Sequence, residues 1–374
     1  MLVAIRVDAS LKMGTGHTYR MLTLARRLKC NEHEVFFVCR RLQGNLIDLV
    51  KSSFPVIELP APDGVVSPVL HCSHGAWLEV DYDLEIQQSR RVISDYLSQN
   101  NRSKLDWLVI DHYAIEATWQ RAMSFLTAHC LQIDDLADRE HQVDILLDQN
   151  YYQRGSVRYN NLLPTSAIRL CGPKYALLRD EFATARQQLL PYESRFKERR
   201  VVLFFGGVDI ANETSKALLG LLSIDSQDHF DVIIGINNPH REVLEKLCSM
   251  YPSRVSLHIQ VINIVEFFSD AYLYVGAVGA TTWERCVMAL PGIVCSVADN
   301  QTQLAIDLSK INGHEYLGLN SELKEDDYAQ AYQRLLTHPE SLFIQSKICA
   351  QLVDGVGCQR VVARLEEISI YDEV

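Results

Sequence analysis

The fold of this chain is decided by residues 2–29, which read LVAIRVDASLKMGTGHTYRMLTLARRLK. The apolar run over residues 2–7 predicts a buried strand, and apolar side chains recur at helical spacing over residues 18–29. Between them lies Gly14-Thr15-Gly16-His17. The glycines let the backbone approach a ligand closely, and the helix that follows directs free amides toward it. The stretch therefore predicts a strand, a ligand-binding turn and a helix in succession.

His17 stands at or just before the first turn of the expected helix, facing whatever the turn holds. The positive end of the helix dipole disfavours the imidazolium form, so a neutral ring could accept a proton there. His17 is therefore a candidate general base. A histidine that caps the helix or simply packs there is the alternative, because a single histidine and a Gly-x-Gly pair are each common.

Strands and helices alternate along the rest of the chain, which predicts parallel sheets covered by helices. In the first half we expect strands at residues 2–7, 35–39, 56–59, 107–111, 131–134 and 145–147, helices at 18–29 and 116–126, and a loop at 60–75. In the second half we expect strands at 201–205, 230–234, 255–259, 272–275 and 293–297, and helices at 212–222, 239–251, 264–269, 282–289 and 301–311. The predicted fold is α/β, with two doubly wound (Rossmann-like) parallel-sheet domains in tandem, facing a ligand cleft at the carboxyl ends of both sheets.

Composition narrows the class of protein. The formal net charge is −11 and hydrophobic residues make up 48% of the 374 residues, which is typical of a soluble globular chain without the basic surface that nucleic acid requires. Residues 1–9 are too short an apolar run for a signal peptide, and no later segment approaches about 18 uncharged residues. We expect a cytoplasmic protein without nucleic-acid or membrane partners. Its oligomeric state stays open.

Cysteine and histidine residues predict no metal site. None of the 10 cysteines belongs to a C-x-x-C pair, which favours buried thiols in a reducing compartment. His71, Cys72 and His74 are close enough in the sequence to bind zinc, but no second cluster at ligand spacing completes such a site. We expect neither a metal nor a cofactor.

Two further small-residue turns follow strands of the expected second domain. Gly206-Gly207-Val208-Asp209 could hold phosphate oxygens with its amides, although Asp209 could equally cap the next helix. In Gly279-Ala280-Thr281-Thr282-Trp283-Glu284, hydroxyls and amides could meet phosphate while the Glu284 carboxylate accepts hydrogen bonds from ribose. Glu284 could instead only favour the helix dipole. Asn300 and Gln301 open a helix at the same edge of the sheet, as caps or as ligand contacts.

Another expected strand ends in Asp111-His112-Tyr113, which places Tyr113 near His17 if the first sheet has the usual strand order. Tyr113 could orient a substrate. A partly buried tyrosine whose hydroxyl is satisfied within the protein is the alternative. Asp134-Asp135 has Asp138 and Arg139 beside it, which favours a structural network over a metal site or an acid–base pair.

These phrases together resemble the UDP-2,4-diacetamido-2,4,6-trideoxy-beta-L-altropyranose hydrolase family of pseudaminic acid biosynthesis. Over about residues 2–320 the matching phrases are RVDAS (6–10), GTGHTYR (14–20), WLVIDHY (107–113), IDDLADR (133–139), GPKYALLR (172–179), FGGVD (205–209) and GATTWER (279–285). That family is similar in turn to glycosyltransferases of GT-B fold, notably the N-acetylglucosaminyltransferase that makes lipid II. The resemblance implies a GT-B-like fold with a catalytic domain at 1–170, a UDP-binding domain at 171–350 and a tail at 351–374 that packs back on the first domain.

Residue by residue, the resemblance puts the base of that family at His17 and its active-site tyrosine at Tyr113. Together with the turns described above, the candidate substrate-binding and UDP-binding residues are Gly14, Gly16, Arg20, Gly206, Gly207, Asp209, Gly279, Thr281, Thr282, Glu284, Asn300 and Gln301. Many relatives have serine at the position of Ala280, so a serine contact is not carried over.

The reaction that the resemblance implies is metal-independent hydrolysis of a UDP-sugar at the anomeric carbon, with inversion. His17 would activate a water, Tyr113 would hold the acetamido sugar, and UDP would leave from a nest of amides. A glycosyltransferase would use the same residues to pass the sugar to an alcohol. A non-catalytic protein would bind the UDP-sugar without turnover, so release of UDP in the absence of an acceptor separates these alternatives.

Overall fold

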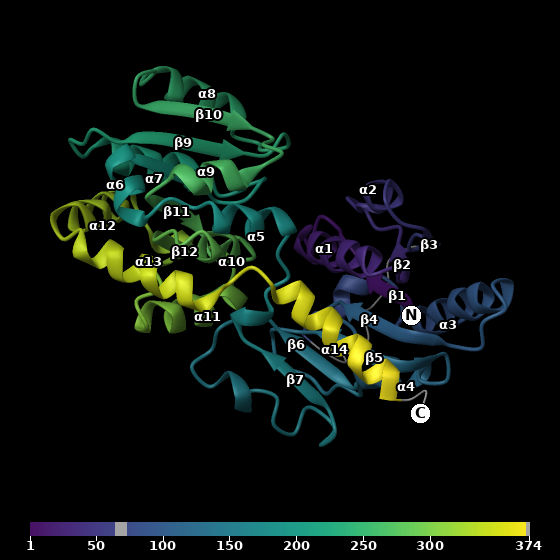
Figure 1. Ribbon diagram of the computed structural model, residues 1–374. Coiled ribbons are helices and arrows are strands. Elements are labelled where there is room, and N and C mark those ends of the chain that lie inside the picture. The colour runs from purple at the N-terminus through teal and green to yellow at the C-terminus, as the bar shows by residue number, and fades with distance from the viewer. Residues whose placement is uncertain (64–72, 372–374) are drawn as a thin grey trace. The chain divides into compact units, whose positions relative to one another are not determined.

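The computed structural model describes residues 1–63 and 73–371, which form two compact units (Figure 1). Of the described residues, unit 1 contains 1–63, 73–150, 154–177 and 356–371, and unit 2 contains 151–153 and 178–355. The end of the chain therefore belongs to the same unit as the first strand.

Unit 1 is built on a 7-stranded sheet. Its strands are β1 (Leu2–Val7), β2 (Glu34–Arg40), β3 (Val56–Leu59), β4 (Leu105–Asp111), β5 (Thr127–Ile133), β6 (Ile145–Asp148) and β7 (Ile168–Cys171). They lie in the order β3-β2-β1-β4-β5-β6-β7, and every neighbouring pair is parallel. The order reverses between β1 and β4. The loops after these two strands lead to opposite faces and leave room for a ligand between them.

Helices cover both faces of this sheet. They are α1 (Gly16–Cys30), α2 (Ile47–Lys51), α3 (Tyr82–Gln99), α4 (Ala117–Met123) and α14 (Gly357–Tyr371). The helices α1 and α14 pack on one face, while α3 and α4 pack on the other. In β1, Val3, Ile5 and Val7 join the first core, and Leu2 and Ala4 join the second. Successive side chains of a strand point to opposite faces, so a strand buried on both sides has the continuous apolar run seen in the sequence.

Unit 2 repeats this plan on a 6-stranded parallel sheet. Its strands are β8 (Arg200–Phe204), β9 (His229–Ile234), β10 (Val255–Ile259), β11 (Leu273–Ala277), β12 (Gly292–Ser296) and β13 (Glu315–Leu319). Its helices are α5 (Asp180–Gln187), α6 (Tyr192–Glu198), α7 (Glu213–Leu222), α8 (Arg241–Ser249), α9 (Ile264–Asp270), α10 (Thr281–Val287), α11 (Asp299–Lys310), α12 (Glu325–Thr337) and α13 (Glu340–Leu352). The strand order β10-β9-β8-β11-β12-β13 reverses between β8 and β11.

The predicted fold class is confirmed, because both halves of the chain form doubly wound parallel sheets. The sequence analysis missed α2, α5, α6, α12, α13, β7 and β13. It also missed α3, whose buried side contains Glu85 and Ser89 at positions where an apolar stripe would have aliphatic side chains. The loop expected at 60–75 lies partly outside the described residues, and residues Gly75–Leu78 form the 3-10 helix η1. No helix of the described chain combines the length and the apolar character needed to cross a membrane.

Candidate active site

The turn after β1 borders open space at the start of α1. Gly14 has a φ of +75°, a left-handed conformation that suits glycine, and its amide donates to the carbonyl oxygen of Ser10 at 2.9 Å. A Cβ atom added at Gly14 or Gly16 would meet no described atom within 4 Å. The helix begins at Gly16 rather than at the expected residue 18, so His17 lies in its first turn. The turn therefore leaves room beside His17.

His17 is held by a carboxylate that the sequence analysis did not select. Asp111 is the last residue of β4, and its Oδ1 lies 2.7 Å from His17 Nδ1, with both side chains buried. An ionised carboxylate can only accept, so at this distance Nδ1 carries a hydrogen and donates it to Asp111. Arg20 Nη2 lies 3.1 Å from the same nitrogen, and in this tautomer it donates to Asp111 Oδ1 at 2.6 Å instead. In the neutral ring, the other nitrogen, Nε2, is then free of hydrogen and can accept a proton. Val7 pairs with Asp111 across β1 and β4, which brings the two ends together.

Arg20 binds the same carboxylate. Its Nε lies 2.6 Å from Asp111 Oδ2 and its Nη2 lies 2.6 Å from Asp111 Oδ1, a bidentate arrangement. Its Nη1 lies 3.5 Å from Asp135 Oδ2. Burial by itself would raise the pKa of Asp111, but Arg20 and His17 hold that pKa well below its ordinary value. The guanidinium of Arg20, a predicted substrate-binding residue, is thus engaged by two carboxylates of the protein.

Tyr113 lies beside His17, with ring centroids 4.5 Å apart and ring planes at 88°. Its hydroxyl donates a hydrogen bond to Asp135. Burial, and after it the charge of Asp135, raises the pKa of Tyr113 well above its ordinary value. Tyr113 therefore keeps its proton near neutral pH. Through Asp135, Tyr113 is connected to Arg20 and so to the carboxylate that holds His17.

The adjacent aspartates 134 and 135 both take part in contact networks within the protein, as the sequence analysis favoured, but in different ones. Asp134 Oδ1 lies 2.8 Å from Arg139 Nη2, and Asp134 Oδ2 accepts the amide of Ala137 at 2.9 Å. These are contacts of a structural network. Asp135, in contrast, contacts Tyr113 and Arg20 and belongs to the candidate active site.

A buried ion cluster lies beneath the turn that leads to His17. Arg6 of β1 binds both carboxylate oxygens of Asp8 at 2.6 and 2.7 Å and Glu85 Oε1 at 3.0 Å. Arg40 of β2 binds Glu85 Oε2 through its Nε at 3.2 Å. All four side chains are fully buried, and their two positive charges match their two negative ones. Removing one partner would leave a buried charge unpaired, so the cluster fixes the start of the turn.

In unit 2, the turn after β8 also has a left-handed glycine. Gly206 has a φ of +97°, and a Cβ added there would meet no described atom within 4 Å. The Asp209 carboxylate accepts hydrogen bonds from the amides of Glu213 and Thr214 at 2.9 and 2.8 Å. The carbonyl oxygen of Gly207 accepts a hydrogen bond from the amide of Gly235 at 2.9 Å. Asp209 therefore caps α7, as the alternative interpretation had it, while Gly206 borders open space.

The turns after β11 and β12 approach each other. The Gly279 amide donates to Thr282 Oγ1 at 3.2 Å, and a Cβ added at Gly279 would lie 3.8 Å from Gln301 Nε2. Gln301 Oε1 in turn accepts the amide of Val297 at 3.0 Å. Because β8, β11 and β12 are neighbours in the sheet, these turns lie at the same edge as Gly206.

Glu284 lies on α10, a helix that begins at Thr281. Burial raises the pKa of Glu284, and the guanidinium of Arg179 opposes that shift, with its Nη2 4.0 Å from Glu284 Oε1. Asn300 is exposed in the first turn of α11. A carboxylate at this edge favours the hydroxyl groups of a ligand and repels its phosphates.

The structure thus brings the predicted residues together in two groups. In unit 1 they are Gly14, Gly16, His17, Arg20 and Tyr113, and in unit 2 they are Gly206, Gly207, Gly279, Thr282 and Gln301. Sequence reasoning missed Asp111, Asp135 and Arg179 as partners of these residues. Asp111 could have been found, because it ends a strand expected next to the one before His17. Asp135 follows the next expected strand and lies in the phrase IDDLADR, and Arg179 ends the phrase GPKYALLR, but their partners could not be read from those phrases.

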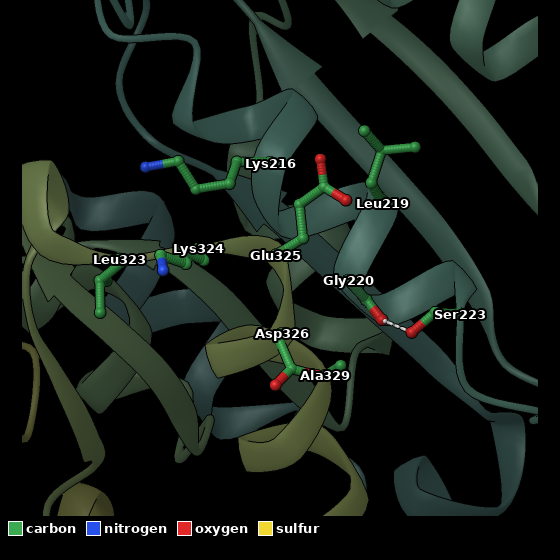
Figure 2. A pocket seen from close by; sticks show the side chains of 9 residues that line it. All are labelled: Lys216, Leu219, Gly220, Ser223, Leu323, Lys324, Glu325, Asp326 and Ala329. Carbon is green, nitrogen blue, oxygen red and sulfur yellow. Dashed lines mark hydrogen bonds between the residues drawn. The ribbon is translucent and has the colours of Figure 1, made fainter.

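A hollow in unit 2 lies apart from these turns, between α7 and α12 (Figure 2). A Cβ added at Gly220 would lie 2.2 Å from the carbonyl oxygen of Glu325, so the two helices approach closely there. Lys216 Nζ at its rim donates to Glu213 Oε2 at 2.8 Å and to the carbonyl oxygen of Asn320 at 2.9 Å. None of the predicted site residues lines it. We interpret the hollow as a gap between the packed helices α7 and α12 and do not assign it a ligand.

Within residues 1–63 and 73–371, no group of at least 3 histidine, cysteine, aspartate or glutamate side chains has the arrangement of a metal site. His71 and Cys72, which were weighed as zinc ligands, lie outside the described residues. No protein-family model matches the chain.

A curated relative is the UDP-2,4-diacetamido-2,4,6-trideoxy-beta-L-altropyranose hydrolase of Campylobacter jejuni. It is 26% identical over 319 residues, which cover 84% of this chain and 98% of that protein. The chain resembles this hydrolase. The resemblance inferred from the sequence phrases is therefore confirmed. An uncharacterised protein of Methanocaldococcus jannaschii is 24% identical over 298 residues, covering 79% of this chain and 55% of that protein, so this chain spans about half the length of that relative.

Solved structures of glycosyltransferases share the fold. Acinetobacter baumannii MurG has a TM-score of 0.67 and 14% identity, covering 98% of this chain and 99% of its own. A UDP-glucosyltransferase of Polygonum tinctorium has a TM-score of 0.68 and 14% identity, and the match covers 100% of this chain and 99% of that enzyme. Arabidopsis thaliana UGT89C1, solved with UDP, has a TM-score of 0.64 and 13% identity, covering 97% and 99%. At these identities the likeness concerns the fold alone, and it confirms the predicted GT-B-like fold.

Proposed function

We propose that the chain hydrolyses UDP-2,4-diacetamido-2,4,6-trideoxy-beta-L-altropyranose at its anomeric carbon, in pseudaminic acid biosynthesis. The observation that carries the proposal is the hydrogen bond from His17 to Asp111, which leaves Nε2 of the neutral ring as a proton acceptor beside an open glycine turn. Similarity to the Campylobacter jejuni hydrolase over 98% of its length supports the choice of substrate.

In the proposed reaction, His17 Nε2 takes a proton from a water molecule as the water oxygen forms a bond to the anomeric carbon. The bond from that carbon to the phosphate oxygen of UDP breaks, and UDP leaves with the bonding electrons. Attack opposite the leaving group inverts the anomeric centre. Asp111 holds the ring in the required tautomer and stabilises the imidazolium that forms. A general base of this kind contributes about 10²–10⁴-fold to the rate.

UDP would be bound by unit 2. Amides of the turns at Gly206, Gly207 and Gly279, with the hydroxyls of Thr281 and Thr282, would meet the phosphates, and Glu284 would accept hydrogen bonds from the ribose. Asn300 and Gln301 would complete this site. The complex of UGT89C1 with UDP supports a nucleotide site on this fold. Hydrogen bonds from fixed amides stabilise the departing diphosphate without a metal, so paired catalytic carboxylates are not required.

The proposed site in unit 1 would hold the sugar. The Tyr113 hydroxyl, which keeps its proton, could donate a hydrogen bond to an acetamido oxygen if it turned away from Asp135.

We place the reaction in the cytoplasm, because the described cysteines are free thiols, as in reducing compartments.

A UDP-sugar-dependent glycosyltransferase is the second candidate function, and the fold shared with MurG and the plant enzymes favours it. His17 would then deprotonate an alcohol acceptor instead of water. The two functions differ in one requirement. The hydrolase releases UDP from its substrate without an acceptor, whereas the transferase needs one.

The test is UDP release from the diacetamido UDP-sugar by wild type and by His17→Ala, with EDTA present and no acceptor added. We expect turnover by wild type and loss of at least about 10²-fold in the variant. His338→Ala, at an exposed histidine of unit 2, is the matched control and should behave as wild type. Binding of UDP without its release from the sugar nucleotide would refute the hydrolase. Equal turnover by His17→Ala would refute the role of His17.

A further inference from the structure

Aromatic rings gather around His17 in unit 1. Besides Tyr113, the ring of Trp77 lies 6.3 Å from His17 between centroids, with the planes at 76°. Trp77 is stacked on Tyr113 at 5.5 Å with an interplanar angle of 30°. His74 meets the Trp77 ring at 4.6 Å and the Tyr113 ring at 5.3 Å. Neither Trp77 nor His74 has a part in the reaction proposed above.

The backbone fixes the position of Trp77. It lies on η1, between residues Gly75 and Leu78 that are both buried. Leu78 belongs to the core on the α3 face of the sheet, and part of the Trp77 side chain packs against that core. The rest of the Trp77 side chain remains accessible. Trp77 thus presents an aromatic surface that is only partly covered by the protein.

The cluster of Trp77, His74 and Tyr113 carries no charge of its own near neutral pH. Burial lowers the pKa of His74, with Arg139 and His17 acting in the same direction and Asp138 against it, so its ring is neutral. Tyr113 keeps its proton because its pKa is raised. An uncharged aromatic surface attracts C–H groups and methyl groups, and it leaves buried hydroxyl groups without hydrogen-bond partners.

We propose that Trp77, supported at its edge by His74, is the surface against which the sugar ring packs. It would favour sugars with methyl and acetamido groups over fully hydroxylated hexoses and would hold the anomeric carbon near His17. This inference rests on the proposed function, because it assigns the sugar-recognition residue of the same site. Trp77 acts as a binding and specificity residue and takes no part in proton transfer.

The experiment compares Trp77→Ala and Trp77→Phe with wild type. We expect KM for the diacetamido UDP-sugar to rise on the order of tenfold in Trp77→Ala, through loss of an aromatic contact, and to recover largely in Trp77→Phe. The inhibition constant of UDP should stay unchanged, because unit 2 would bind the nucleotide. Inhibition by UDP-N-acetylglucosamine, which has more hydroxyl groups, should weaken less than KM rises.

Phe125→Ala is the matched control, since Phe125 is a 49% exposed aromatic side chain of unit 1 outside the ring cluster. The proposal is overturned when Trp77→Ala changes KM no more than this control does. It is also overturned when the UDP inhibition constant rises by the same factor, because Trp77 then only supports the fold. If wild type binds the UDP-sugar but releases no UDP, the proposed reaction fails. In that case, binding decides the role of Trp77. The proposal predicts that Trp77→Ala raises the ratio of the dissociation constant of the UDP-sugar to that of UDP, and an unchanged ratio overturns it.

Discussion

The glycine turns of unit 1 and of unit 2 stand on the same kind of sheet and yet are supported in different ways. Around His17 in unit 1, the partners are charged side chains that are mostly buried, among them Asp111 and Arg20. Around Gly206 and Gly279 in unit 2, the groups offered are largely backbone amides and hydroxyls. A fold that repeats itself thus repeats the backbone of the site without repeating its chemistry.

The difference follows from what each site is proposed to do. Moving a proton requires one nitrogen of one ring in a fixed tautomer, and here the carboxylate of Asp111 fixes it. Holding a diphosphate requires several hydrogen-bond donors, which a turn in the left-handed conformation supplies without any cation. Changes in unit 1 should therefore alter the rate of the reaction, and changes in unit 2 should alter nucleotide affinity.

Asp111→Asn should have the largest effect on the rate. An asparagine can fill the same space, but it no longer stabilises a positive charge on His17. We expect kcat for UDP release to fall by about 10²–10⁴-fold while the dissociation constant of UDP stays within about twofold of wild type. Steady-state kinetics and calorimetry measure the two quantities. Asp95→Asn, at a 61% exposed side chain on α3, is the control. A weaker binding of UDP with unchanged kcat would reverse the comparison between the units.

Arg20→Gln should reduce the rate by a smaller factor. The guanidinium binds both oxygens of Asp111 and so fixes the carboxylate that positions His17. Without it, the carboxylate is held less firmly against His17 Nδ1. We expect kcat for UDP release to fall by about tenfold, while the dissociation constant of UDP stays unchanged.

Arg41→Gln, at an arginine that is 63% exposed and pairs with Glu58, is the control for the Arg20 variant. A loss of kcat in Arg20→Gln no larger than in this control, or an equal rise in the dissociation constant of UDP, would contradict a positioning role of Arg20.

Gly206→Ala should act on binding instead. The φ of +97° is unfavourable for alanine, and the new methyl group would project into the space beside the turn. We expect the dissociation constant of UDP to rise about tenfold, the equivalent of about 1.4 kcal/mol, with a smaller change in kcat. Gly318→Ala is the matched control, because Gly318 lies in β13 with a φ of +128°, which is also unfavourable for alanine. Equal losses of UDP affinity in both variants would contradict a specific role of the Gly206 turn.

Asp148→Asn should have the smallest effect, visible only in stability. Burial, and then the charge of Asp135, raises the pKa of Asp148 to about 7, compared with about 3.9 in an unfolded chain. The folded protein therefore binds a proton that the unfolded chain releases, and this contribution to stability is lost as the pH rises from about 4 to 7.

For Asp148→Asn we expect the midpoint of urea unfolding to depend less on pH between these limits than it does in wild type. Asp231 of unit 2 gives the opposite sign. Burial would raise the pKa of Asp231, but His258 and Arg200 lower it, so its contribution is present at neutral pH and is lost in acid. Parallel pH profiles for Asp148→Asn and Asp231→Asn would contradict this assignment.

Much of the architecture could be predicted from the sequence, because strands buried on both faces appear as unbroken apolar runs. β1 and β8 are clear examples, and each is followed by a glycine turn. The helix α3 could not be predicted in this way, since Glu85 on its buried side is paired with Arg6 and Arg40 from distant strands. The same limit applies to the candidate site. His17 and Tyr113 were visible as motifs, whereas the role of Asp135 depends on contacts between segments far apart in the chain.

The helix α14 closes unit 1 from the far end of the chain. Trp107 Nε1 donates to Ser369 Oγ at 2.9 Å, and Glu366 Oε1 lies 2.8 Å from His33 Nε2. On the ribosome, the first strands emerge long before this helix does, while residues 178–355 of unit 2 emerge as one block. Unit 2 can therefore complete its fold before α14 has emerged, whereas part of the core of unit 1 stays uncovered until α14 emerges. A nascent chain stalled before residue 357 would present the apolar surface that Val361, Val362 and Leu365 cover in the finished protein.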